Sequence, residues 1–414
     1  MNTDVVYDPY GQFERIEMSN GFNIYYLNVD RPWIKGTFML NVGNVDCPVG
    51  KSGLAHFVEH LVFENHNSMS YQEVSDFFEG YGGFINGSTS ASQTQFVFNV
   101  PIDTLVFRKT IEIFSNLLLN HTIGNNFEKQ KNIINQEINE TFPDNHMEYF
   151  HAHTQFVFQD THFKGIKSNL GSVLEFNALS LEDCSNFYTK NYTPQNMSLV
   201  LIGNINPEIK SILSDSEFAL NSSGKKKNLI EFKTYSFWKK ETIVFNKNEF
   251  LFLQKTWKLN FVLDFSIDRP ILYIHKVMLY KVLFNKFREE LNANYNFSVN
   301  VETLQGFHVY SIFFAVNSMD YSQIESYFNE CIFSLNTRWS EFLQAKNFLI
   351  QGILMADSSF SKILFNTVRE LDLYREIQSY SEEIAGYESA TFEELQEFNN
   401  FLISKSNKYI EIVK

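Results

Sequence analysis

The order of strand and helix signals in the first half of this 414-residue chain returns in the second half. Strand-like segments such as residues 22–29 precede helical ones, and a short apolar strand at 197–205 closes the first half. A polar stretch rich in turn residues follows at 214–232, and then the alternation begins again. Because the chain is longer than one ordinary domain, we expect an N-terminal domain at residues 1–220 and a C-terminal domain at 221–414.

This repeated order predicts an α+β fold of two similar domains related by internal duplication. Each domain is expected to hold a mainly antiparallel sheet with helices packed on one face. The strand-like segment at residues 94–100 supports this expectation, because Thr94, Phe96, Phe98 and Val100 alternate with other residues in the period of a strand with one buried face.

Charge and composition exclude several classes of protein. The chain has 34 basic and 48 acidic residues and a formal charge of −14, so it lacks the cations that a nucleic-acid binder uses against phosphates. Its three cysteines, Cys47, Cys184 and Cys331, form neither a disulfide framework nor a metal clip. No apolar run approaches the length of a membrane span, and the first residues lack the pattern of a secretory signal. We expect a cytoplasmic protein without a membrane span.

The segment GLAHFVEHLVFENHN at residues 53–67 carries two histidines four residues apart, with a glutamate directly before the second. On a helix, His56, Glu59 and His60 fall on one face. The apolar positions share the opposite face: Leu54, Phe57, Val58, Leu61 and Val62. Two neutral imidazoles one turn apart can bind the same zinc ion, and the glutamate can then take a proton from an attacking water. The alternative is three unrelated polar residues on a helix.

A catalytic zinc site usually has a third protein ligand. The segment FEKQKNIINQEINETF at residues 127–142 is helical in pattern, and Glu137 lies in the middle of its broad buried stripe. An unpaired carboxylate is costly to bury there, and a metal removes that cost. Glu140, almost one turn later at the edge of the stripe, is a second candidate that either orients the site or replaces Glu137 as the ligand.

Together these motifs resemble the pitrilysin/insulinase family of inverted-zincin peptidases. HxxEH is followed by the glutamate after 76 residues, which is the family's spacing. GLAHFVEHLVF is similar to the family's zinc-binding helix, GYGGFINGSTSASQTQF to the strand after its glycine turn, and NYTPQNMSLVLIGNI to the end of its first domain. The resemblance covers essentially the whole chain. It points to the short two-domain branch, which includes mitochondrial processing peptidase subunits and bacterial processing-protease-like proteins.

The resemblance implies that His56, His60 and Glu137 bind one zinc ion per chain, and that Glu59 is the general base of peptide-bond hydrolysis. It also shows two departures. Many members carry a glutamate seven residues before the ligand, where this chain has Gln130, so a charge behind the ligands is lost. After the helix, FENHN replaces the more usual Gly-Thr, which reshapes the wall of the site.

Two further groups of residues resemble substrate-binding positions of the family. Arg288 and Tyr295 match an arginine–tyrosine pair of the second domain that reaches the substrate near the zinc, where both can donate hydrogen bonds. The alternative is an arginine that suits a helix end and a tyrosine that suits a strand. Asn86, Gly87 and Ser88 stand where members hold an extended peptide beside a strand edge, unless they only finish a glycine-rich turn.

With the motif, the resemblance therefore implies a zinc-dependent endopeptidase that cleaves peptides or short unfolded segments inside a closed chamber. Longer family members enclose a chamber with four domains, so two domains imply a homodimer in which Arg288 and Tyr295 of one chain face the zinc of the other. A heterodimer with a sister subunit is the alternative. The second function class is a non-catalytic or partner-dependent peptide-binding subunit of a heterodimeric processing protease. A narrower possibility is removal of the leader from a ribosomally made peptide.

Overall fold

The computed structural model describes most of the chain. The described residues are 7–64, 69–120, 122–124, 126–142, 146–161, 163, 167–221, 224, 239–250, 253–264, 266–290, 296–304, 307–315, 320–356 and 359–414. Most of the predicted linker at 214–232 lies outside them, so the boundary between residues 220 and 221 stays a prediction. Among the described residues, no helix combines the length and the apolar character that crossing a bilayer requires.

The N-terminal half forms a six-stranded sheet in the order β1-β2-β6-β3-β5-β4. All neighbouring strands are antiparallel except β2 and β6. The strands are β1 (Glu14–Glu17), β2 (Asn23–Asn28), β3 (Trp33–Leu40), β4 (Phe84–Thr89), β5 (Thr94–Pro101) and β6 (Met197–Gly203). Residues 94–100 form the strand expected from their alternation, with every second side chain buried.

The helices of this half come mostly between β3 and β6 in the chain. They are α1 (Leu54–Phe63), α2 (Tyr71–Gly80), α3 (Thr104–Leu118), α4 (Phe127–Thr141), α5 (His146–Val157), α6 (Val173–Asn177), α7 (Leu181–Asn191), α8 (Pro207–Ser214) and α9 (Glu217–Leu220), with 3-10 turns at Tyr10–Gln12, Asn44–Asp46 and Pro194–Asn196. A phenylalanine-rich core lies between these helices and one face of the sheet.

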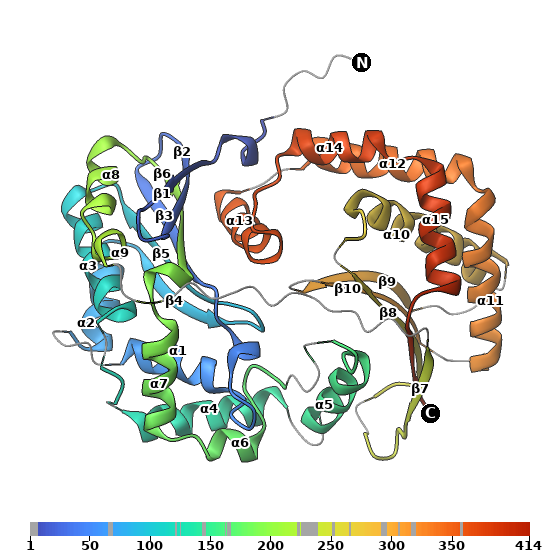
Figure 1. Ribbon diagram of the computed structural model, residues 1–414, viewed down its shortest axis with the longest axis horizontal. Helices are drawn as coiled ribbons and strands as arrows, with labels where there is room; N and C mark the ends of the chain where they lie inside the picture. The colour runs from blue at the N-terminus through green and yellow to red at the C-terminus, as the bar shows by residue number, and fades with distance from the viewer. Residues whose placement is uncertain are drawn as a thin grey trace.

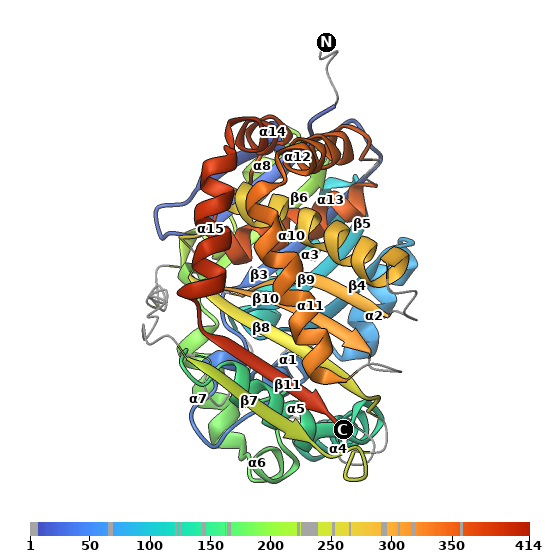
Figure 2. The same cartoon turned by 90° about the vertical axis from the view of Figure 1, so that its right-hand side faces the viewer.

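The C-terminal half forms a five-stranded sheet in the order β7-β11-β8-β10-β9, whose strands lie side by side in Figure 2. The strands are β7 (Lys240–Phe245), β8 (Thr256–Asp264), β9 (Phe297–Leu304), β10 (Phe307–Ala315) and β11 (Lys408–Val413). The helices are α10 (Arg269–Phe284), α11 (Tyr321–Ser334), α12 (Trp339–Leu354), α13 (Phe360–Tyr374), α14 (Tyr380–Ser389) and α15 (Phe392–Ser404), with a π-helical extension of α10 at Asn285–Glu290 and a 3-10 turn at Leu335–Thr337.

The two sheets share one topology. The order β2-β6-β3-β5-β4 corresponds strand for strand to β7-β11-β8-β10-β9, with β1 as an extra edge strand. In each sheet the first strand of this set pairs with the last strand in a parallel manner, and the remaining pairs are antiparallel. The predicted fold class, two similar α+β domains with mainly antiparallel sheets, is confirmed.

Each half also covers the second face of the other half's sheet, a feature that the prediction did not contain. Helix α13 of the C-terminal half lies beside the N-terminal sheet (Figure 1), where Ile363 and Val368 pack with Val200 and Ile202 of β6. On the C-terminal sheet, Val157 at the end of α5 joins a small apolar cluster with residues that include Phe307 and Val309 of β10. Because both faces of each sheet carry apolar side chains, each face needs a covering layer.

Candidate metal centre

Helix α1 carries the HxxEH segment and is buried against α7, α4 and strand β4. The five apolar residues predicted to share one face are almost fully buried: Leu54, Phe57, Val58, Leu61 and Val62. The helix begins after Gly53, which adopts a φ of +85° and lies so close to Leu170 that a Cβ would stand 2.7 Å from the carbonyl oxygen. Glycine is therefore required where the chain enters the helix.

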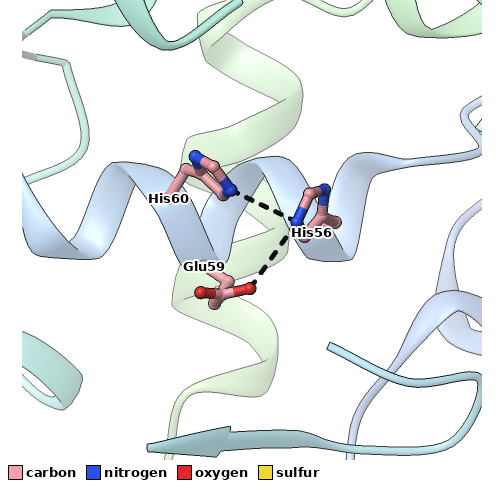
Figure 3. A group of neighbouring side chains, drawn as sticks. All are labelled: His56, Glu59 and His60. Carbon is pink, nitrogen blue, oxygen red and sulfur yellow. Dashed lines mark hydrogen bonds and ion pairs between the residues drawn. The ribbon is translucent and has the colours of Figure 1, made fainter. Parts of the chain in front are cut away.

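The side chains of His56, Glu59 and His60 project from α1 toward one another (Figure 3). The two Nε2 atoms of the histidines are 3.2 Å apart. Glu137 on α4 approaches both, with one carboxylate oxygen 3.9 Å from His56 Nε2 and the other 3.8 Å from His60 Nε2. A tetrahedral zinc ion with bonds of about 2.0–2.1 Å places its ligand atoms roughly 3.3 Å apart. The two histidine nitrogens have this spacing, and the carboxylate oxygens of Glu137 lie slightly farther from them.

The environment of His56 favours the neutral imidazole that a metal requires. Burial, reinforced by the neighbouring His60, lowers the pKa of His56 to about 3. An unprotonated ring keeps a lone pair for a metal ion at neutral pH. The Nδ1 atom of His56 is buried and has no hydrogen-bond partner among the described residues.

Glu59 has the properties of a group that exchanges protons near neutral pH. The residue is only 5% exposed, and one carboxylate oxygen lies 3.9 Å from His56 Nε2. Burial raises the pKa of Glu59 to about 8, with a hydrogen bond from Thr89 opposing and the charge of Glu137 adding to the rise. A nearby cation would lower this pKa again. A carboxyl with such a tunable pKa beside a metal site is suited to general acid–base chemistry.

These residues line a cavity of about 630 Å³ whose other wall is strand β4. The predicted substrate-binding residues Asn86, Gly87 and Ser88 belong to this strand and line the cavity. Since β4 is the last strand of its sheet and pairs with β5, its outer edge can accept an extended peptide. Gly87 approaches Glu59 so closely that a Cβ at position 87 would stand 2.3 Å from Glu59 Oε1.

Behind the histidines the structure shows an arrangement that the sequence analysis missed. Gln130 is 6% exposed, and its Oε1 lies 3.1 Å from His60 Nδ1. Its Nε2 donates a hydrogen bond to Glu64, the residue that follows α1. The signal available in the sequence was the carboxylate of Glu64, four residues after the second histidine. The negative charge is absent from position 130, as expected, and Glu64 places a negative charge next to Gln130. Glu140, in contrast, is exposed and does not line the cavity.

The structure does not bring the predicted arginine to the cavity of the same chain. Arg288 lies in the π-helical extension of α10, and its guanidinium carbon is 4.9 Å from the centre of the Phe284 ring. Helix α10 belongs to the other half of the molecule from α1 (Figure 1). Tyr295 lies outside the described residues. The roles of both residues stay predictions.

A duplicated α+β fold with HxxEH on a buried helix and a carboxylate on a later helix defines an inverted-zincin type of protein. Comparison with protein families agrees with this class. Residues 38–163 match the model described as "Insulinase (Peptidase family M16)", and residues 178–341 match "Peptidase M16 inactive domain". The chain therefore belongs to the insulinase family, peptidase family M16. All residues of the candidate metal centre lie in the first matched span.

Several relatives of this chain are named as proteases. Zinc protease PqqE of Helicobacter pylori is 22% identical over 211 residues, which cover 50% of this chain and 46% of that protein. The uncharacterized zinc protease YmfH of Bacillus subtilis is 27% identical over 208 residues, 46% of each chain. The mitochondrial-processing peptidase subunit beta of Saccharomyces cerevisiae is 23% identical over 164 residues, 39% of this chain and 34% of that one. Each match spans less than half of the relative's own length.

Solved structures show the same fold over nearly the whole chain. A protease from Helicobacter pylori matches with a TM-score of 0.76 and 18% identity, covering 99% of this chain and 100% of that one. The periplasmic protease PqqL from Escherichia coli matches with a TM-score of 0.80 and 15% identity, covering 97% of this chain but 47% of that one. This chain thus corresponds in fold to about half of the PqqL chain.

Proposed function

We propose that this protein is a zinc-dependent endopeptidase. The observation that carries the proposal is the convergence of His56, His60 and Glu137 beside the buried Glu59, at the wall of a cavity bordered by an edge strand. The relatives named as zinc proteases support it.

The residues of the candidate site have different proposed roles in peptide hydrolysis. His56, His60 and Glu137 would hold a zinc ion, which would lower the pKa of a water molecule and polarise a peptide carbonyl. Glu59 takes a proton from the attacking water and returns it to the leaving amine. The outer edge of β4 pairs with the backbone of an extended peptide, which gives affinity with little sequence preference.

A non-catalytic, peptide-binding subunit is the competing function. The family description "inactive domain" applies to residues 178–341 and leaves the metal centre outside. Since the three candidate ligands and Glu59 are all present in one cavity, the enzyme is the better-supported function. Removal of a leader from a ribosomally made peptide would use the same site and differs only in substrate.

Replacing Glu59 by glutamine tests the proposal. The amide keeps the shape of the carboxylate but takes up no proton, so cleavage of a fluorogenic peptide should fall by about 10²–10⁴-fold. Zinc content and peptide affinity should persist, because Glu59 is not a ligand. His60→Ala is the matched control and should lose both zinc and activity. Full activity of Glu59→Gln, or loss of its zinc, would contradict the assignment of Glu59 as the base.

We also propose that two copies of the chain close the chamber. The longer PqqL chain, of which this chain matches 47%, supports a functional unit of twice this size. The position of Arg288 away from the cavity of its own chain is consistent with a role at the site of a second copy. A heterodimer with a sister subunit is the competing assembly, and the cytoplasmic location also stays a prediction.

A further inference from the structure

The carboxylate of Glu64 lies one side chain behind a candidate zinc ligand. We propose that Glu64 is a positioning residue of the metal centre, which fixes the amide of Gln130 so that His60 presents its Nε2 lone pair to the metal. This inference rests on the proposed zinc function. It assigns a role to a residue of the FENHN segment, where the chain departs from its family.

The hydrogen bonds determine the orientation of the amide. An ionised carboxylate can only accept hydrogen bonds, so the NH2 group of Gln130 must face Glu64. The carbonyl oxygen of the same amide then faces His60 Nδ1 at 3.1 Å. Because this oxygen can only accept, Nδ1 carries the hydrogen, and the lone pair of the neutral ring is at Nε2. That atom is the one directed at His56 and Glu137.

Gln130 alone would not select the His60 tautomer that has its hydrogen on Nδ1 and its lone pair on Nε2. Its two ends have nearly the same shape, and the reversed amide would donate a hydrogen bond to His60 Nδ1. The ring would then carry its hydrogen on Nε2, which cannot bind a metal while protonated. A glutamate in place of Gln130 would impose the correct state directly. In this chain Glu64 imposes it through the amide.

The structure holds Glu64 in the charged form that this role needs. The residue is 6% exposed, and burial alone would raise the pKa of its carboxyl. Hydrogen bonds from Asn126, Lys129 and Gln130 outweigh burial and lower that pKa. Asn126 donates at 2.6 Å and Lys129 at 3.2 Å. A buried carboxylate with several donors is stable as an anion.

Glu64 also connects the two helices that carry the ligands. It follows α1 directly, with its backbone N–H bonded to the Leu61 carbonyl. Its side-chain partners Lys129 and Gln130 lie on α4, the helix of Glu137. The same contact therefore fixes the His60 ring and the spacing between α1 and α4. Groups behind metal ligands of this kind typically contribute about 10–100-fold to metal affinity.

Zinc affinity of the full chain, measured by competition with a chromophoric chelator, tests the inference without an activity assay. Glu64→Gln should bind zinc about 10–100-fold more weakly than the wild type. Combining Glu64→Gln with Gln130→Glu exchanges the positions of charge and amide and should restore the affinity to within a few-fold. Glu128→Gln removes an exposed carboxylate from α4, the helix of Gln130, and should leave the zinc affinity unchanged.

The outcomes separate this inference from the proposed function. Wild-type affinity of Glu64→Gln would overturn it, and so would a loss that the exchanged pair fails to restore. Melting temperatures of the zinc-free variants identify any that do not fold, and a milder Glu64→Asp replaces such a variant, with an intermediate loss of affinity expected. A wild-type chain that binds no zinc would refute the proposed function itself.

Discussion

At the scale of the single residue, the candidate site requires a glycine beside Glu59 as well as the polar side chains. Gly87 of β4 leaves no room for a methyl group, since a Cβ would stand 2.3 Å from Glu59 Oε1 and 2.7 Å from a ring carbon of Phe63. Glu59, the proposed base, and the edge strand β4 are therefore in close contact at Gly87. Glycine permits that approach because it has no Cβ.

Gly87→Ala should therefore displace Glu59 and leave the metal in place. Misplacing a catalytic group by about 1 Å can cost on the order of 10²-fold, so kcat should fall strongly while zinc affinity stays near the wild-type value. Gly80→Ala is the matched control, because a Cβ at Gly80 would contact no other side chain or loop within 4 Å. An alanine variant at position 87 with normal kcat would show that Glu59 is not held by this contact.

At the scale of the element, a fully buried polar network joins α10, β10 and α15. His275 of α10 lies 2.9 Å from the Tyr310 hydroxyl and 2.9 Å from Asn399 Oδ1. Asn399 uses its amide hydrogens elsewhere, so its oxygen accepts from His275 Nε2, and Nδ1 accepts from Tyr310. The neutral ring satisfies both partners, and protonation would bury a charge.

Acid should therefore destabilise this half of the protein through His275. Burial lowers the pKa of His275 to about 4, whereas an unfolded chain titrates near 6.5. Between these values the unfolded state binds more protons, so the free energy of unfolding falls as the pH decreases, by up to about 1.4 kcal/mol per pH unit. Urea unfolding at several pH values should show a smaller slope for His275→Gln than for the wild type. Equal slopes would contradict the prediction.

At the scale of the whole molecule, the crossed packing of α5 and α13 makes each half depend on the other. Residues of α13 bury one face of the N-terminal sheet, while α5 contributes to the cover of the C-terminal sheet. His153 of α5 also lies 2.6 Å from the buried carboxylate of Glu411 on β11. Contacts of this kind oppose independent opening of the two halves.

We expect the two halves to unfold in one cooperative transition. Ile363→Ala in α13 should lower the free energy of unfolding by about 2–5 kcal/mol, the usual effect of truncating a buried aliphatic side chain. Hydrogen exchange should accelerate in β3 and β6, although the substitution lies in the other half. Phe365→Ala alters an exposed position of the same helix and should have little effect. Protection of β3 and β6 that is unchanged by Ile363→Ala would show that the halves are independent.

Mixing two inactive variants tests the proposed dimer. His60→Ala lacks a zinc ligand and Arg288→Ala lacks the arginine, so each homodimer should be impaired. In a mixed dimer, one of the two sites combines the intact metal centre of the second variant with the intact arginine of the first. Because random exchange makes about half of the dimers mixed, peptide cleavage by a 1:1 mixture should recover toward about one quarter of the wild-type rate. Mass measurement in solution should give twice the chain mass. An active monomer, or no recovery on mixing, would contradict the homodimer.

The sequence by itself determined the fold class and the candidate ligands. HxxEH on a helical pattern places His56, Glu59 and His60 together, because spacing along one helix is a local property. The repeated order of strand-like and helical segments predicted two similar sheets, because the signals for strands and helices are also local. The stripe on the second helix left both Glu137 and Glu140 open. The resemblance to the insulinase family favoured Glu137, whose side chain is 36% exposed in the structure and not buried as the stripe predicted.

The tertiary structure alone decided the features that join distant parts of the chain. Gln130 donates a hydrogen bond to Glu64, Gly87 lies against Glu59, and Ile363 packs with β6. No local pattern encodes these contacts. From the sequence, Gln130 was interpreted as the loss of a charge, because Glu64, its neighbour in space, is 66 positions away in the chain. Periodicity reports which face of an element is buried, whereas the partner on that face depends on how the elements pack.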